Sequence, residues 1–108
     1  MPIGQATQEM NYGKSRPEAL NDLEKAMNLI GTVQDKDPGS ATLLGTTKYG
    51  FQTVRIQATV LGDGSTSTIK IIALSDDAWG AGAKNGIQRL TDALQHIGDP
   101  NYSANKTG

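Results

Sequence analysis

Three polar side chains in the C-terminal part of this sequence are of types that take part in catalysis. They are Asp77, Asn85 and His96, the last being the only histidine in the chain. A histidine can act as a general base near neutral pH, and a carboxylate or an amide can orient it. However, His96 is predicted in the last turn of a helix, where the helix dipole favours its charged form and a surface role explains it better. An enzyme that uses these three residues is the weakest of our three functional hypotheses, and we expect no enzymatic activity.

Two further patterns could bind ions or cofactors but lack the spacing that such sites need. Asp35 and Asp37 flank a turn, and no calcium-binding loop follows them. In the glycine-rich segment 80–86, Lys84 is followed by Asn85, whereas a phosphate-binding loop has Ser or Thr at that position. We therefore expect no metal ion and no cofactor.

The same glycine-rich segment opens the second of two predicted helices and needs an explanation of its own. Each glycine costs a helix roughly 1 kcal/mol relative to alanine. Either the glycines let the helix pack closely on a sheet, or their bare N–H groups bind an anion. The preceding Asp76 and Asp77 would repel an anion and are well placed to cap the helix, so close packing is favoured.

Composition excludes several classes of function. Lys and Arg number 10 and Asp and Glu 11, scattered along the chain, so a nucleic acid partner is not expected. The absence of cysteine excludes thiolate catalysis and zinc–thiolate sites. No apolar run has the length of a membrane span, and the N-terminus is polar, unlike a signal peptide. We expect a cytoplasmic protein, unless a leader has been removed.

Two amphipathic helices are predicted. The first begins with Ser15, Pro17 and Glu18, a capping box with proline in the first turn, and Gly31 is its expected end. The second runs toward Gly98, where a left-handed cap is expected before Pro100. Apolar residues recur in both at steps of three and four, so each helix has one face to bury.

Between the helices the sequence alternates with a period of two, which is typical of antiparallel strands. Strands are predicted over residues 32–34, 41–48, 51–61 and 66–75, with a weaker one over residues 5–12 before the first helix. The turn residues predict that Lys48 pairs with Phe51 and Leu61 with Thr66. The sequence thus predicts an α+β fold of order β-α-β4-α, with a curved antiparallel sheet and both helices packed on one face.

This register divides the sheet into two faces. The face toward the helices carries small and aliphatic residues, among them Ile56 and Ile71. The other face carries threonines, Gln57 and Lys70, together with apolar residues that need a partner or a cover. We predict that an interaction surface forms there, consisting of Leu44, Phe51, Arg55, Ile72 and Leu74.

The closing helix also carries a pattern that resembles a known group of domains. After a Gly-Asp-Gly hairpin come Asp77, Trp79, Gly80, Asn85, Arg89, Leu90, Ala93 and Leu94. This pattern resembles small bacterial domains of unknown function that end in a similar Trp-Gly, Asn, Arg-Leu helix. The extra Gly86 departs from their spacing between Asn and Arg. The order of elements is also similar to half of a TATA-binding-protein saddle, which implies a fold and not a function.

These observations lead to one domain, over residues 1–100, followed by a disordered tail over residues 101–108. The main hypothesis is a non-catalytic binding or assembly module, homodimeric through the open sheet face. The alternative is a carrier of a small apolar ligand. Its pocket would lie between the sheet and the helices, near Tyr12, Met27 and Trp79.

Overall fold

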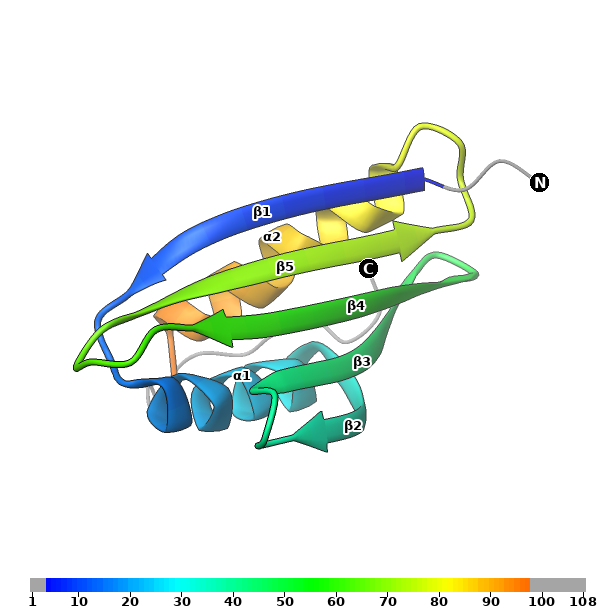
Figure 1. Cartoon of the computed structure of the whole chain (residues 1–108). Coiled ribbons are helices and arrows are strands. Elements are labelled where there is room, and N and C mark those ends of the chain that lie inside the picture. Colours follow the sequence, from blue (N-terminus) through cyan, green and yellow to red (C-terminus); the bar gives the residue numbers. More distant parts are fainter. Residues whose placement is uncertain (1–3, 98–108) are drawn as a thin grey trace.

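The computed structural model describes residues 4–97, which form a five-stranded antiparallel sheet with two helices on one face (Figure 1). The strands lie in the order β1-β5-β4-β3-β2, so the first two strands of the chain form opposite edges. The elements, in chain order, are β1 (Gly4–Tyr12), α1 (Arg16–Ile30), β2 (Gly31–Asp37), β3 (Thr42–Tyr49), β4 (Gln52–Leu61), β5 (Ser67–Ser75) and α2 (Ala81–Gln95).

The predicted α+β fold and its order of elements are confirmed, with differences at the ends of elements. Strand β2 is longer than expected and includes the segment 35–37, predicted as a turn. Helix α2 ends at Gln95, and His96 occupies the C-cap position expected for Gly98. The predicted boundary at residue 100 and the tail over residues 101–108 lie outside the described residues.

The predicted strand register is wrong by two residues at both hairpins. Tyr49 pairs with Gln52, so the turn is Gly50-Phe51, one residue later than expected. Leu61 pairs with Thr68 instead of Thr66, because the loop between β4 and β5 is longer. A shift of two keeps every side chain on its predicted face, whereas a shift of one would have exchanged the faces.

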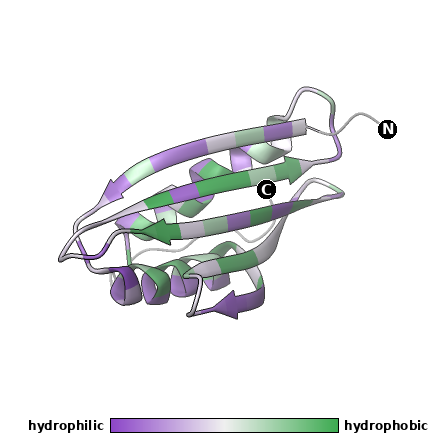
Figure 2. Cartoon of the chain, viewed as in Figure 1, coloured by the Kyte–Doolittle hydropathy of each residue, from purple (hydrophilic) through white to green (hydrophobic). Residues whose placement is uncertain are grey.

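The face toward the helices forms the hydrophobic core. Ile71 is 1% exposed, whereas the next residue, Ile72, is 39% exposed. Figure 2 shows the same alternation as hydrophobic and hydrophilic bands along the central strands. The buried apolar side chains of the sheet are Leu43, Val54, Ile56, Ala58, Val60, Ile69, Ile71 and Ala73, as predicted from the alternation, and Ala41 is buried in the turn just before β3.

A polar side chain that the sequence predicts lies near the start of each helix. Ser15 is the N-cap of α1, but its hydroxyl donates to the Glu18 carboxylate at 2.8 Å and makes no capping bond to a backbone N–H. The N-cap of α2 is Gly80, in the left-handed conformation. At α2 the Asp77 carboxylate accepts the N–H groups of Ala81 and Gly82. Neither helix within residues 4–97 combines the length and apolar character that crossing a membrane requires.

Candidate binding surfaces

The helices pack closely on the sheet at two glycines, Gly45 and Gly86. The Met27 side chain of α1 is fully buried and lies directly over Gly45 of β3, where an added Cβ would come within 2.5 Å of Met27 Cγ. On α2, a Cβ at Gly86 would lie 3.0 Å from Val54 Cγ1. These contacts favour the close-packing explanation of the glycines and leave no room for a ligand beside Met27.

The structure does not bring Tyr12, Met27 and Trp79 together into one pocket. Trp79 is 89% exposed in the loop before α2, next to the start of β1, where Gly4 contacts Gly80. Tyr12 ends the same strand, eight residues later, at a distance of about 26 Å for an extended chain. Tyr12 and Trp79 thus lie near opposite ends of β1, and the predicted pocket near all three residues stays a prediction.

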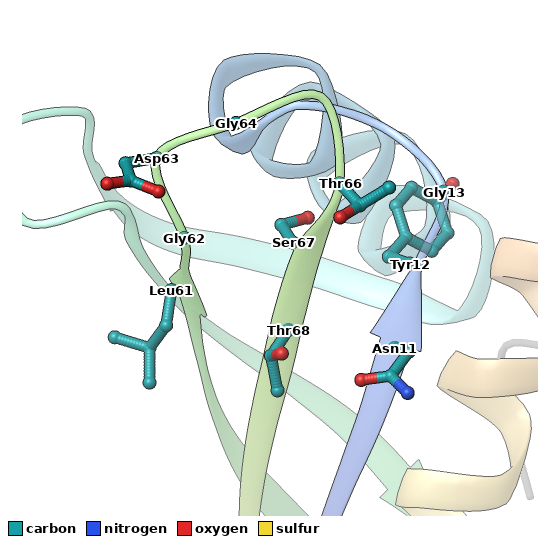
Figure 3. Close-up of a pocket in the computed structure, with 10 residues that line it drawn as sticks. All are labelled: Asn11, Tyr12, Gly13, Leu61, Gly62, Asp63, Gly64, Thr66, Ser67 and Thr68. Atoms are coloured by element: carbon teal, nitrogen blue, oxygen red, sulfur yellow. The ribbon is translucent and has the colours of Figure 1, made fainter.

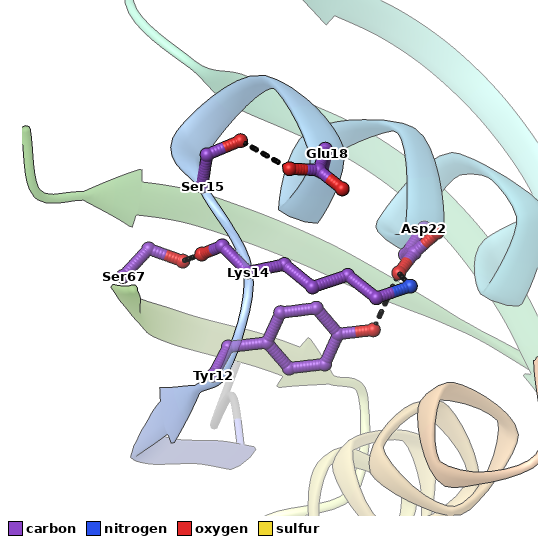
Figure 4. A network of polar contacts seen from close by, with 6 residues as sticks. All are labelled: Tyr12, Lys14, Ser15, Glu18, Asp22 and Ser67. Carbon is purple, nitrogen blue, oxygen red and sulfur yellow. Dashed lines mark hydrogen bonds and ion pairs between the residues drawn. The ribbon is translucent and has the colours of Figure 1, made fainter. Parts of the chain in front are cut away.

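Tyr12 instead belongs to a polar network that fastens the end of β1 to α1 (Figure 4). The Tyr12 hydroxyl and the Lys14 ammonium both donate to Asp22 Oδ2, at 2.7 and 2.8 Å. The Ser67 hydroxyl of β5 donates to the Lys14 carbonyl at 2.9 Å. This network connects three elements, and a structural role explains it.

Burial, hydrogen bonds and charges in this network determine the protonation states of Asp22 and Tyr12. Burial raises the pKa of the Asp22 carboxyl, but the hydrogen bonds from Lys14 and Tyr12 outweigh burial, so the pKa is lowered overall. Burial, followed by the Asp22 hydrogen bond and charge, raises the pKa of Tyr12. Tyr12 therefore stays protonated and cannot serve as a base near neutral pH.

The three residues of the enzyme hypothesis are spread along α2. Asp77 precedes the helix, Asn85 lies within it and His96 follows it. A helix of 15 residues is about 22 Å long, so Asp77 and His96 cannot act on the same substrate atom. The His96 ring meets the carbonyl of Asp92 through Nδ1 at 2.8 Å, an interaction that belongs to the end of the helix.

Asp77 is held in its charged form by its capping role. The Ser75 hydroxyl, the N–H groups of Gly82 and Ala81 and the Gln52 amide together lower the pKa of Asp77 to about 2. The Ser75 hydroxyl is buried and makes no hydrogen bond of ordinary geometry, so it acts on the carboxylate as a nearby dipole. Since Asp77 occupies the first N–H groups of α2, an anion has no free site there.

Arg89 has a structural role that the sequence analysis missed. Its guanidinium donates to Thr47 Oγ1 and the Lys48 carbonyl at 2.9 Å each, and to the Ile30 carbonyl at 3.2 Å. The Thr47 hydroxyl donates to the same Ile30 carbonyl at 2.6 Å. Arg89 thus joins α2 to the last turn of α1 and to β3. The sequence feature that could have pointed to this role was the presence of Arg89 in the pattern that resembles the small bacterial domains.

A shallow depression of about 360 Å³ lies on the outer face of the sheet, away from both helices. Side chains from β3, β4 and β5 line it because paired residues on neighbouring strands point to the same face. One row across the sheet is Leu44, Gln57 and Ile72, and the next is Thr46, Arg55 and Leu74. Gln34 of β2 closes one side through a hydrogen bond of 3.4 Å to Thr46 Oγ1.

This depression contains four of the five residues predicted for the interaction surface. Leu44, Arg55, Ile72 and Leu74 line it, whereas Phe51 is fully exposed in the β3–β4 turn and does not. Phe51 was assigned to β4 because the predicted turn was placed one residue too early. The same error put Arg55 in the row of Leu44, where the structure has Gln57. Gln57 and Thr46 were interpreted as ordinary solvent-side residues and, like Gln34, were not predicted for the surface.

A larger open hollow of about 660 Å³ lies at the opposite end of the sheet, between the β4–β5 loop and the end of β1 (Figure 3). Its lining is mainly polar and includes Asn11, Asp63 and Thr66. Within residues 4–97 no group of His, Cys, Asp or Glu side chains is arranged to hold a metal ion. With Leu61 as its one large aliphatic side chain, the hollow lacks the apolar floor of a ligand site.

Comparison with known proteins identifies the fold and no family. No protein-family model and no curated protein matches the sequence. Among solved structures the chain is similar to that described as "Crystal structure of Ara h 8.0201", with a TM-score of 0.59 and 12% identity over 88% of this chain and 97% of that one. At this identity the likeness shows the fold alone, an α+β fold with a curved antiparallel sheet. The comparisons give no support to the bacterial group of domains or to the likeness to the TATA-binding protein.

Proposed function

We propose that this protein is a non-catalytic binding module that carries a small apolar molecule with an anionic group on the outer face of its sheet. The observation that supports this most strongly is the depression lined by Leu44, Ile72 and Leu74 with Arg55 among them. Its volume of about 360 Å³ falls within the range of small-molecule sites. The structural neighbour Ara h 8 has a Bet v 1-like, ligand-binding fold, and this likeness supports a carrier over an assembly module.

The preference for an anionic group follows from Arg55. It is exposed at the centre of the sheet, and within residues 4–97 its guanidinium has no hydrogen-bond or ion-pair partner. Its neighbours in the row are Thr46 and Leu74, neither of which carries a charge. A carboxylate or sulfate on an aliphatic chain would pair with the guanidinium while the chain covers the leucine and isoleucine side chains.

The test uses three probes that share one chain and differ in the head group: decanoate, decanol and decylamine. We expect decanoate to bind most tightly in titration calorimetry, with a Kd between about 1 μM and about 1 mM. Chemical-shift changes should fall on the methyl groups of Leu44, Ile72 and Leu74. Arg55→Gln should remove the preference for decanoate over decanol.

Two matched variants make this test decisive. Ile72→Lys places a charge inside the depression, whereas Leu61→Lys places one on the same face outside it. The two wild-type side chains are exposed to almost the same extent, 39% and 42%. We expect only Ile72→Lys to abolish binding. Equal loss in both variants, or no binding of any probe to the wild type, would refute the proposal.

Self-association through the same face is the second candidate, favoured by the exposure of Leu44, Leu61 and Ile72 on one side of the sheet. Their exposed apolar area is on the order of 200 Å², no more than an ordinary monomer shows. A stable dimer buries about 800 Å² on each partner. The size of the patch therefore favours a small ligand. A dimer in analytical ultracentrifugation that Ile72→Lys dissociates, without loss of folding, would reverse this preference.

A further inference from the structure

The two edges of the sheet are built in opposite ways. At the β2 edge the pairing shifts between Val33 and Asp35, and Lys36 points inward to bond with Asn21 and Glu24 of α1. A bulge and an inward-pointing lysine are devices that stop an edge strand from pairing with another chain. The β2 edge is thus protected.

The β1 edge has none of these devices. All nine residues of β1 pair with β5 in unbroken register, and Glu9 is the one charged residue among them. Glu9 lies 3.9 Å from Lys70 of the neighbouring strand, so its charge is compensated within the sheet. Within residues 4–97, no backbone hydrogen bond joins β1 to a segment other than β5, and Figure 1 shows β1 as the open border of the sheet.

We infer that β1 is a homodimerisation edge, on which β1 of a second copy pairs antiparallel with Gln8 on the two-fold axis. This register uses the whole strand, because Gly4 then faces Tyr12 of the partner copy. It sets Gln5 opposite Asn11 and Thr7 opposite Glu9, so no two like charges face one another. A shift that centred the pairing on Glu9 would bring two carboxylates together. The two five-stranded sheets become one continuous sheet.

Helix α2 supports this register from the inner side. A groove of about 250 Å³ runs between α2 and the edge, with Gln8 and Gln88 both in its lining. Lys84 lies four residues before Gln88 and Asp92 four residues after it. The two-fold axis through Gln8 makes the two helices antiparallel, so Lys84 of each copy approaches the Thr91 end of the other, which carries no charge in this groove.

The experiment uses the absence of natural cysteines, so that one introduced cysteine reports one contact. In this register residue 8 faces itself across the axis, with Cα atoms about 5 Å apart, a separation that a disulfide spans. Gln8→Cys should therefore form a disulfide-linked dimer in air. Asn11→Cys is the matched control, because it faces Gln5 and lies about 20 Å from its own copy. It should remain monomeric on a non-reducing gel.

Equilibrium sedimentation of the full chain supplies the second measurement. We expect a dimer that Gln8→Lys weakens by at least about tenfold, because two lysines would then face each other. Ile72→Lys should leave dimerisation unchanged, which separates this inference from the outer-face proposals. A monomer at all concentrations together with no disulfide at Gln8→Cys would overturn the inference. So would equal cross-linking of Asn11→Cys, or a dimer that only Ile72→Lys dissociates.

Discussion

Ile71 and Ile72 are adjacent, identical residues on β5, and they lie in opposite surroundings. Ile71 lies against the helices and is 1% exposed, whereas Ile72 lies on the outer face and is 39% exposed. Leu43 and Leu44 repeat the contrast on β3. One face of the sheet is thus buried in the core, and the same residue types on the other face are exposed to solvent. Substitutions that compare the faces directly test this division.

The largest difference in stability is expected between adjacent residues that lie on opposite faces of the sheet. Leu43→Ala and Ile71→Ala should each lower the free energy of unfolding by about 2–5 kcal/mol, because they open cavities in a filled core. Leu44→Ala and Ile72→Ala should cost less than about 1 kcal/mol, since their side chains are already partly in water. Urea denaturation of the four variants measures both effects. Similar losses on the two faces would show that the outer face is covered in solution.

A smaller effect is expected where the helix meets the sheet most closely. Gly45→Ala should destabilise the protein by about 1–3 kcal/mol, since its Cβ would overlap Met27. Gly64→Ala is the control, because a Cβ there has no neighbour within 4 Å. Thermal unfolding of both variants gives the comparison. If Gly45→Ala proves neutral, the space beside Met27 is looser than the structure indicates, and an interior ligand site would be restored.

Arg89 and Arg55 extend the comparison of the two faces to charged side chains. Arg89→Met should cost about 1–3 kcal/mol, because it leaves the Ile30 and Lys48 carbonyls without this donor. Arg55→Met should change stability by no more than about 0.5 kcal/mol, since Arg55 sits exposed on the outer face. Chemical denaturation measures both variants. A large loss from Arg55→Met would mean that Arg55 has a structural partner and is not available to a ligand.

The division into two faces could be predicted from sequence because it depends only on alternation along each strand. Ile56 and Ile71 stay on the same face under the two-residue error in register, whereas an error of one residue would have separated them. The rows across the sheet depend on the exact length of each turn, and neither the Gly50-Phe51 turn nor the β4–β5 loop has residues that fix one length. Most residues of the predicted surface were therefore placed on the correct face, but the rows that they form across the strands were not predicted.

Side-chain contacts between distant elements were beyond prediction for a different reason. The bonds from Tyr12 and Lys14 to Asp22, and from Arg89 to Ile30, depend on how α1 and α2 cross the sheet. Periodicity indicates which face of a helix is buried but not its crossing angle. The pocket near Tyr12, Met27 and Trp79 was likewise predicted without knowledge of how the helices cross the sheet. Nothing in the sequence showed that Met27 would meet Gly45, or that Tyr12 and Trp79 would lie at opposite ends of β1.

The smallest effect concerns acid stability and the cap of α2. The pKa of Asp77 is lowered to about 2 in the folded protein, compared with about 3.9 in an unfolded chain. Its stabilising contribution is therefore complete above about pH 4 and is lost as the pH falls toward about 2. Asp77→Asn should be less stable than the wild type at neutral pH, and the two curves should converge in acid. The pKa of Asp22 is also lowered, so the variant keeps part of the acid dependence.

Urea denaturation at a series of pH values measures this convergence. Asp76→Asn is the matched control, because there the backbone N–H, not the carboxylate, makes the hydrogen bond, to Gln52 Oε1 at 2.8 Å. The stability of Asp76→Asn should change with pH in the same way as that of the wild type. Parallel curves for Asp77→Asn would show that its carboxylate does not cap α2 in solution. The N–H groups of Ala81 and Gly82 would then be open to an anion at the start of α2, away from the outer face.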